Sequence, residues 1–249
     1  MIKALLLRRF WLIRHRFMTT LAFMIILPLM LHVSITMVMK NILVHSLSNI
    51  PYDVWVFPGI ILLIAVSATF AMIYRDLFDL RIHKKSFIPI TMAPYSKFHL
   101  VVGFLTTSII ESLIYVIFAM GILTLLLSSS LPWSAYIIIP IFSFLYTFLF
   151  GNLMITFSVL TDRISTYLFI SVIMFLFIIF GTGVLVEFDF YPKTIGTILS
   201  YNPLSIVLTQ LRQLLFSNTI QGDLLAIPVV TSLIWTWMNG ALLKRRLKQ

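Results

Sequence analysis

The chain has 249 residues, of which 60% are apolar and only 10% are charged. About a quarter of the residues of a soluble domain are charged, so this composition excludes a soluble fold for lack of polar surface. The sequence contains no cysteine, which excludes disulfides, thiolate metal sites and cysteine nucleophiles. The formal net charge of +10 indicates basic cytoplasmic loops beside anionic lipid rather than nucleic-acid binding.

Apolar runs long enough to cross a membrane occur six times along the chain. A spanning helix needs about 20 apolar residues, and charged or turn residues separate the runs. The expected spans are residues 18–39, 54–74, 98–127, 133–160, 164–186 and 224–243. The sequence therefore predicts an all-α polytopic membrane protein with one transmembrane domain over residues 1–249. The first run is long and no small-residue cleavage site follows it, so we expect it to be retained.

Lys and Arg are divided unequally between the two sides of these spans. Fifteen lie in the N-terminal segment, the loop after the second span, the turn after the fourth span and the C-terminal tail, and three lie on the other side. Positively charged loops stay in the cytoplasm. We therefore expect a multi-pass protein of the cytoplasmic membrane with both termini in the cytoplasm.

The segment before the first span, residues 1–17, is amphipathic. Its apolar stripe at helical spacing consists of Ile2, Leu6, Phe10, Ile13 and Phe17. Basic residues fill much of the remaining surface. This pattern predicts a helix that lies on the cytoplasmic leaflet.

Two later segments are neither spans nor simple loops. Residues 75–97 place acidic residues before basic ones and then contain Pro89 and Pro94, which predicts a short cytoplasmic helix that ends at the prolines. Residues 187–223 are too apolar for a free loop and too interrupted for a span. We expect one or two short helices there that dip into the outer leaflet and cap the bundle.

The amino-acid sequences of two segments resemble those of a known protein family. Pro58-Gly59 opens the second span, and Ala93-Pro94 follows the cytoplasmic helix. The stretch YNPLSIVLTQLRQLLF holds an asparagine-proline-leucine motif with an arginine downstream. Together with the basic amphipathic start, the six spans and the broken outer segment, these features resemble the membrane subunit of type-2 ABC exporters over nearly the whole chain.

The resemblance implies roles for two groups of residues. The cytoplasmic helix, residues 79–92, would be the coupling helix that receives the motion of an ATPase. Its candidate contact residues are Asp79, Arg81, His83, Lys84, Lys85 and Phe87. The motif residues of the outer re-entrant segment are Asn202, Pro203, Leu204 and Arg212.

The resemblance also implies partners. No glycine in the sequence is followed by Lys, so it contains no G-x-x-x-x-G-K-[ST] phosphate loop. We expect ATP and Mg²⁺ to bind a separate cytoplasmic ABC ATPase subunit, and no cofactor to bind this chain. A second permease copy or a close homologue would complete a dimer in the inner membrane of a prokaryote.

Motifs of membrane enzymes are missing from the sequence. It contains neither H-E-x-x-H nor G-x-S-x-G, and its five histidines are scattered. Only one acidic residue lies well inside a span, so paired-carboxylate chemistry has no second member at that depth. We therefore expect no catalytic residues and no metal site.

The acidic residue in the third span is Glu111, about 20 Å along the helix at 1.5 Å per residue. Thr107, Ser108 and Tyr115 share its face at helical spacing. An acid at this depth is a candidate for a substrate path, and the structural alternative is a neutral Glu that bonds a neighbouring helix. The sequence leaves both interpretations open.

Three functions remain at this point. The leading hypothesis is the permease of an ATP-driven exporter for a hydrophobic or lipid-linked substrate, such as a lipid-linked glycan, a lipid or a drug, because the spans offer few polar groups to hold a hydrophilic solute. The first alternative is a secondary transporter in which Glu111 carries a proton. The second is an assembly subunit of a membrane complex without transport of its own.

Overall fold

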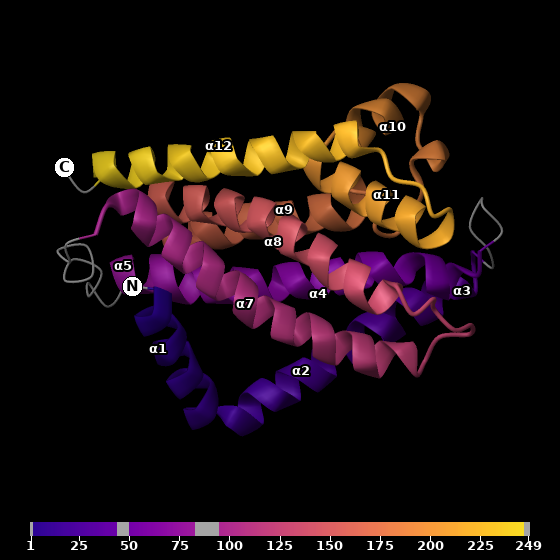
Figure 1. Ribbon diagram of the computed structural model, residues 1–249, viewed down its shortest axis with the longest axis horizontal. Helices are drawn as coiled ribbons and strands as arrows, with labels where there is room; N and C mark the ends of the chain where they lie inside the picture. The colour runs from indigo at the N-terminus through magenta and orange to yellow at the C-terminus, as the bar shows by residue number, and fades with distance from the viewer. Residues whose placement is uncertain (1, 44–49, 83–94, 247–249) are drawn as a thin grey trace.

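The computed structural model describes residues 2–43, 50–82 and 95–246, and these residues form helices and connecting turns (Figure 1). The elements are α1 (Ile2–His15), α2 (Phe17–Leu31), η1 (His32–Met37), α3 (Val38–Lys40), α4 (Tyr52–Ile73), η2 (Tyr74–Asp79), α5 (Leu80–Ile82), α7 (Lys97–Thr124), α8 (Ala135–Leu160), α9 (Ile164–Gly181), η3 (Phe188–Phe190), α10 (Lys193–Ser200), α11 (Pro203–Phe216) and α12 (Gly222–Arg246). This confirms the expected all-α architecture.

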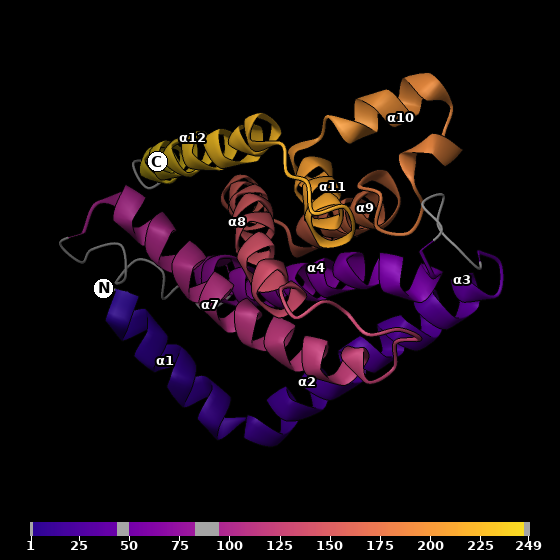
Figure 2. The same ribbon diagram turned by 45° about the vertical axis from the view of Figure 1, so that its right-hand side comes forward.

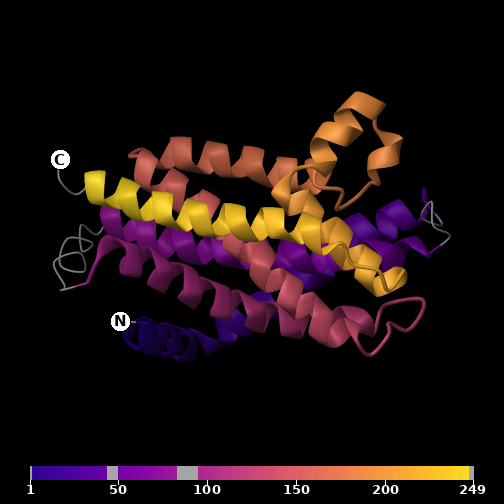
Figure 3. The same cartoon turned by 45° about the horizontal axis from the view of Figure 1, so that its top comes forward.

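Six helices among the described residues are long and apolar enough to cross a membrane, as expected. They cover Phe17–Lys40, Tyr52–Ile82, Lys97–Thr124, Ala135–Leu160, Ile164–Gly181 and Gly222–Arg246. The start of α1 and the end of α12 lie at the same end of the bundle (Figures 1 and 3). We call this the basic end, because the last turn of α12 carries Lys244, Arg245 and Arg246, and we call the opposite end the far end.

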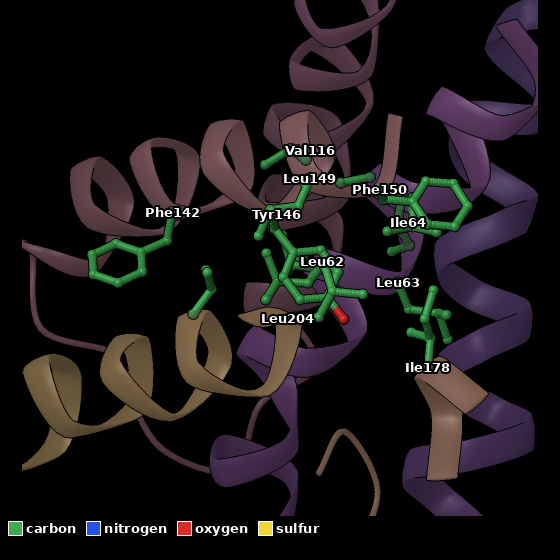
Figure 4. Close-up of a cluster of buried hydrophobic side chains, with 14 of the residues drawn as sticks. Leu62, Leu63, Ile64, Val116, Phe142, Tyr146, Leu149, Phe150, Ile178 and Leu204 are labelled. Atoms are coloured by element: carbon green, nitrogen blue, oxygen red, sulfur yellow. The ribbon is translucent and has the colours of Figure 1, made fainter. Parts of the chain in front are cut away.

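The second span, α4–η2–α5, is the central helix of the bundle. It packs most extensively against α7 and α8, and nearly all of α4 is buried. Figure 4 shows its side chains Leu62 and Ile64 beside Tyr146 and Phe150 of α8, and Leu63 beside Ile178 of α9. The first and fifth spans are the least buried, so their apolar side chains remain available to lipid.

The second span is longer than the expected residues 54–74, because its helix continues to Ile82. Charged residues from Arg75 onward suggested a loop to sequence reasoning. The structure keeps this stretch helical and buries Asp76, whose charge is compensated by arginines described below. The expected coupling segment thus begins as a direct extension of the central helix, and residues 83–94 lie outside the described part of the chain.

The fifth span is shorter than expected and ends at Gly181. Gly183 follows with φ of +77°, a left-handed conformation that residues with a side chain rarely adopt. The turn directs the chain into η3, α10 and α11 at the far end, where α11 lies beside α9 and α10 projects outward from the bundle (Figure 2). Two short α-helices thus occupy residues 187–223.

Helix α1 faces the bundle with a different side from the expected apolar stripe. Phe10 and Phe17 of that stripe are exposed, while Leu5 packs against the core and Arg9 is buried. The helix therefore docks through a charged group. Ile2, Phe10 and Phe17 of the stripe are exposed on the surface of the protein, where a membrane would cover them.

A polar network joins α12 to α8. The amide of Asn239 donates to the main-chain oxygen of Asn152 at 2.9 Å and to its side-chain oxygen at 3.0 Å. Thr156 donates to Asn239 at 2.7 Å and accepts from the indole of Trp235 at 2.9 Å. Such interhelical bonds hold helices together where apolar packing alone gives little preference over lipid.

Candidate functional site

A buried ionic cluster joins α1, η2 and α7 near the basic end. The guanidinium of Arg9 lies 2.8 Å from the carboxylate of Asp76 through Nη2 and 2.8 Å from that of Glu111 through Nη1. The relative exposures are 4% for Arg9, 2% for Asp76 and 7% for Glu111. One side chain from the N-terminal helix therefore compensates two carboxylates of the spanning helices.

Two more arginines lie at the edge of this cluster. Arg8 lies 3.8 Å from Asp76, and Arg75 lies 3.5 Å from Asp76 and 3.9 Å from Glu111. Burial lowers the pKa of the Arg9 guanidinium, and the charges of Asp76 and Glu111 oppose that effect. Three arginines thus face two carboxylates, which leaves the cluster with an excess of positive charge.

A cavity of about 270 Å³ lies beside the cluster. Its lining residues are Leu12, Ile13, Arg16, Thr19, Thr20, Phe23, Arg75, Glu111 and Tyr115. It is formed where the corner between α1 and α2 diverges from α7 (Figure 2). We call it the corner cavity.

The four residues of the expected polar stripe do not share one environment. Glu111 and Tyr115 line the corner cavity. Thr107 and Ser108 are fully buried, and their hydroxyls donate to carbonyls of their own helix, Thr107 to Gly103 and Ser108 to Phe104, each at 2.9 Å. These two hydroxyls are satisfied by the backbone, so only half of the stripe can contact a molecule in this cavity.

Sequence reasoning missed the partners of Glu111. The sequence places Arg9 among several basic residues of a surface helix, and Asp76 near the start of a short cytoplasmic helix. The sequence does contain a signal for this contact, because Glu111 is a single acid inside a span and the N-terminal segment is rich in basic residues that could compensate its charge. Nothing local, however, distinguishes Arg9 from Arg8 or Arg14.

Of the coupling candidates, Asp79 and Arg81 lie in the described helix, whereas His83, Lys84, Lys85 and Phe87 lie outside the described residues. Arg81 donates to the carbonyl of Ser158 at 2.6 Å, to that of Val159 at 3.3 Å and to that of Thr161. Its guanidinium thereby caps the carboxyl end of α8, where carbonyls lack helical partners and a positive charge is favoured.

The C-terminal end of α12 also contacts the neighbours of Arg81 at the basic end. Arg81 and Arg246 flank Asp162 at 3.0 Å and 3.7 Å, and Arg246 donates to the carbonyl of Leu160 at 3.0 Å. Arg81 therefore connects α5 directly to the end of α8, and through Asp162 to the end of α12.

The motif residues of the outer segment organise α11. The side chain of Asn202 accepts from the amide of Leu204 at 2.9 Å, and Pro203 occupies the first turn. This is an N-cap followed by a proline at a position where its missing N–H is harmless. The motif begins the helix, and the side chain of Leu204 is buried in the core.

Arg212 connects α11 to the other elements at the far end. It donates to the carbonyls of Trp55 at 3.2 Å, Gly183 at 2.6 Å and Val184 at 3.0 Å. Its guanidinium also lies 3.5 Å from the ring centroid of Trp55, a cation–π contact. The arginine of the motif therefore connects α11 to the start of α4 and to the turn after α9.

A larger cavity, of about 840 Å³, opens beside Arg212. Its lining residues are Trp55, Gly183, Glu187, Phe188, Asp189, Tyr191, Lys193, Gly196, Thr197, Ser200, Thr209, Arg212 and Gln213. Both charge signs and three aromatic rings contribute to it. Its volume of about 840 Å³ lies within the range of about 300–1,000 Å³ that is typical of small-molecule pockets.

Comparison with protein families finds no family model that matches the chain, and no curated protein matches it significantly. Among the residues that the structure describes, no group of three His, Asp or Glu side chains could hold a metal ion.

Proposed function

We propose that this chain is the permease subunit of an ATP-driven exporter of the type-2 ABC kind. The observation that carries the proposal is the order of the elements. An amphipathic helix, α1, precedes six span-length helices, and two short α-helices, α10 and α11, stand between the fifth and sixth. The asparagine-proline-leucine motif begins α11, at the position where the family resemblance expects a re-entrant helix.

ATP would be hydrolysed on a separate cytoplasmic ABC subunit that contacts the segment after Ile82. The helix from Tyr52 to Ile82, which includes a π-helical segment at Tyr74–Asp79, supports this division of labour, because it connects the expected contact segment directly to the core of the bundle. Arg81 would pass a displacement of this segment to α8 and α12 through the carbonyls and the carboxylate that it contacts.

A second copy of the permease, or a close homologue, would complete the transporter. The first and fifth spans are apolar and the least buried in the single chain, so they have surface available for a partner copy as well as for lipid. The cargo would be hydrophobic or lipid-linked, since the spans expose mainly apolar side chains.

Co-purification and transport test the proposal together. A tagged chain should recover a protein with a Walker motif from its native membrane, and the pair should hydrolyse ATP in proteoliposomes. Reversal of both Lys84 and Lys85 to Glu should weaken recovery of the ATPase. The matched control, reversal of Lys244 and Arg245 on α12, should leave it intact. Recovery of the chain without any ATPase would contradict the proposal.

The energy source separates the exporter from the proton-coupled alternative. Depletion of ATP should stop export, whereas an ionophore that collapses the proton gradient should not. Glu111 already has Arg9 as a cationic partner at 2.8 Å, so its charge does not require a transported proton for compensation. Export that survives ATP depletion and stops with the ionophore would favour the secondary transporter.

A further inference from the structure

Among the side chains that line the corner cavity, positive charges available to a ligand outnumber negative ones. Arg16 and Arg75 are the basic residues of its lining, and Glu111 is its one acidic lining residue. The Glu111 carboxylate already accepts a hydrogen bond from Arg9 at 2.8 Å. An anion in the cavity would therefore meet two guanidinium groups and one carboxylate whose charge is compensated.

Arg75 has a donor that the protein leaves unused. Its Nη2 atom is buried and has no hydrogen-bond partner within the described structure, although it lies 3.9 Å from Glu111. A buried donor without a partner is costly. Thr19, Thr20 and Tyr115 add hydroxyl groups to the same lining. These groups match the acceptor oxygens of a phosphate.

The rest of the lining is apolar and continues onto a lipid-facing surface. Phe23, in the lining, is 61% exposed, and Ile26 and Met30 follow it on α2 at 56% and 63%. The volume of about 270 Å³ is below the range of about 300–1,000 Å³ typical of pockets that enclose a drug-sized molecule. It suits a headgroup whose hydrocarbon chains stay outside, along α2.

The cavity also adjoins the start of the first spanning helix. Arg16 directly precedes the first spanning helix, which begins at Phe17. On the orientation expected from Lys and Arg, this is the cytoplasmic leaflet, where anionic lipids attract basic residues. We propose that the corner cavity binds the phosphate of an anionic phospholipid between Arg16 and Arg75, and that this lipid connects the α1–α2 corner to α7.

The inference is independent of ATP-driven export and is tested by binding alone. The full chain, purified in detergent, is titrated with phosphatidylglycerol and separately with phosphatidylcholine, and bound lipid is counted by native mass spectrometry. Phosphatidylglycerol should bind more tightly. Arg16→Gln should weaken its binding about fivefold, the effect of about one basic residue near a lipid surface, and Arg75→Gln should do the same.

The control is Arg14→Gln, which removes the same charge two residues before Arg16, at the end of α1 and outside the cavity lining, and should change binding less than twofold. Because Arg75 also contacts Asp76, Arg16→Gln decides the outcome if Arg75→Gln unfolds. Equal losses in Arg14→Gln and Arg16→Gln would overturn the proposal, and so would equal binding of the two lipids. Displacement of the lipid by inorganic phosphate at equal concentration would assign the site to a soluble anion instead.

Discussion

The guanidinium of Arg9 lies 2.8 Å from the carboxylate of Glu111, although 102 residues separate them in the chain. Both groups are buried, and Arg9 reaches Asp76 at the same distance. The N-terminal helix is therefore held to the bundle by charge rather than by its apolar stripe. Removal of one member of a buried ionic group leaves the others uncompensated, which costs more than the group contributes when intact.

Arg9→Met should destabilise the protein by about 3–5 kcal/mol, because it leaves two buried carboxylates with only the more distant Arg8 and Arg75. Glu111→Gln should lower the free energy of unfolding by less, since Arg9 retains its ion pair with Asp76. Thermal unfolding in detergent measures both. Arg14→Met, on an exposed part of the same helix, is the control and should leave the melting temperature nearly unchanged.

The triple variant Arg9→Met, Asp76→Asn, Glu111→Gln removes all three charges and should recover part of the stability that Arg9→Met loses. Equal stability of the Arg9→Met and Arg14→Met variants would contradict a structural role for the cluster. Full transport by the Glu111→Gln variant over a range of pH would show that Glu111 acts in packing rather than on the substrate path.

Arg212→Lys should destabilise the far end by about 1–3 kcal/mol even though the positive charge remains, because buried carbonyls lose their donors. A lysine cannot reproduce three carbonyl contacts together with a stack on Trp55. The loss should appear as a lower melting temperature and as faster proteolysis between α9 and α11. Lys193→Arg, in the same cavity lining, should change neither, and an unaltered Arg212→Lys variant would refute this account.

Gly59→Ala should destabilise the protein through Arg212. A methyl group on Gly59 would lie 3.2 Å from Arg212 Nη2 and 3.2 Å from the carbonyl oxygen of Val184. It would therefore disturb the hydrogen bond that Arg212 donates to Val184. Gly121→Ala is the matched control, because nothing lies within 4 Å of its added methyl. That change should stabilise α7 by up to about 1 kcal/mol, from helix propensity alone. Equal effects at the two positions would argue against close packing at Gly59.

Asn239→Leu should loosen α12 from α8. It removes the two bonds to Asn152 and the bond from Thr156. Interhelical hydrogen bonds in membranes contribute about 0.6 kcal/mol each, with a maximum of about 1.7, so we expect a loss of about 1–2 kcal/mol in unfolding assays. Met238→Leu, at a 49% exposed neighbour, should be neutral, and a similar loss there would point to general perturbation of the helix.

Cysteine labelling tests the orientation. Thr219→Cys, in the turn before α12, should react with an impermeant thiol reagent in sealed cells. Ser165→Cys, in the first turn of α9 at the basic end, should react only after the cells are opened. The sequence has no native cysteine to confuse the result. Labelling of Ser165→Cys in sealed cells would reverse the expected topology.

Several features of the protein follow from local sequence. The length of each apolar run determines that six helices can cross a membrane, because about 20 residues suffice for the hydrocarbon thickness. The Asn202-Pro203 pair marks the start of a helix through an N-cap and a proline that needs no donor. These signals depend on residues within a few positions of one another, so they can be read without a fold.

The tertiary structure alone decided which charges are buried and what they contact. Charges from Arg75 onward suggested the end of a helix, yet the helix continues to Ile82 because Asp76 meets Arg9 from another element. Likewise, Thr107 and Ser108 shared a helical stripe with Glu111, but packing of α7 separates their hydroxyls from the corner cavity. Helical spacing assigns a residue to a face of its own helix. Only the packing of residues distant in sequence determines whether that face meets a partner, a cavity or lipid.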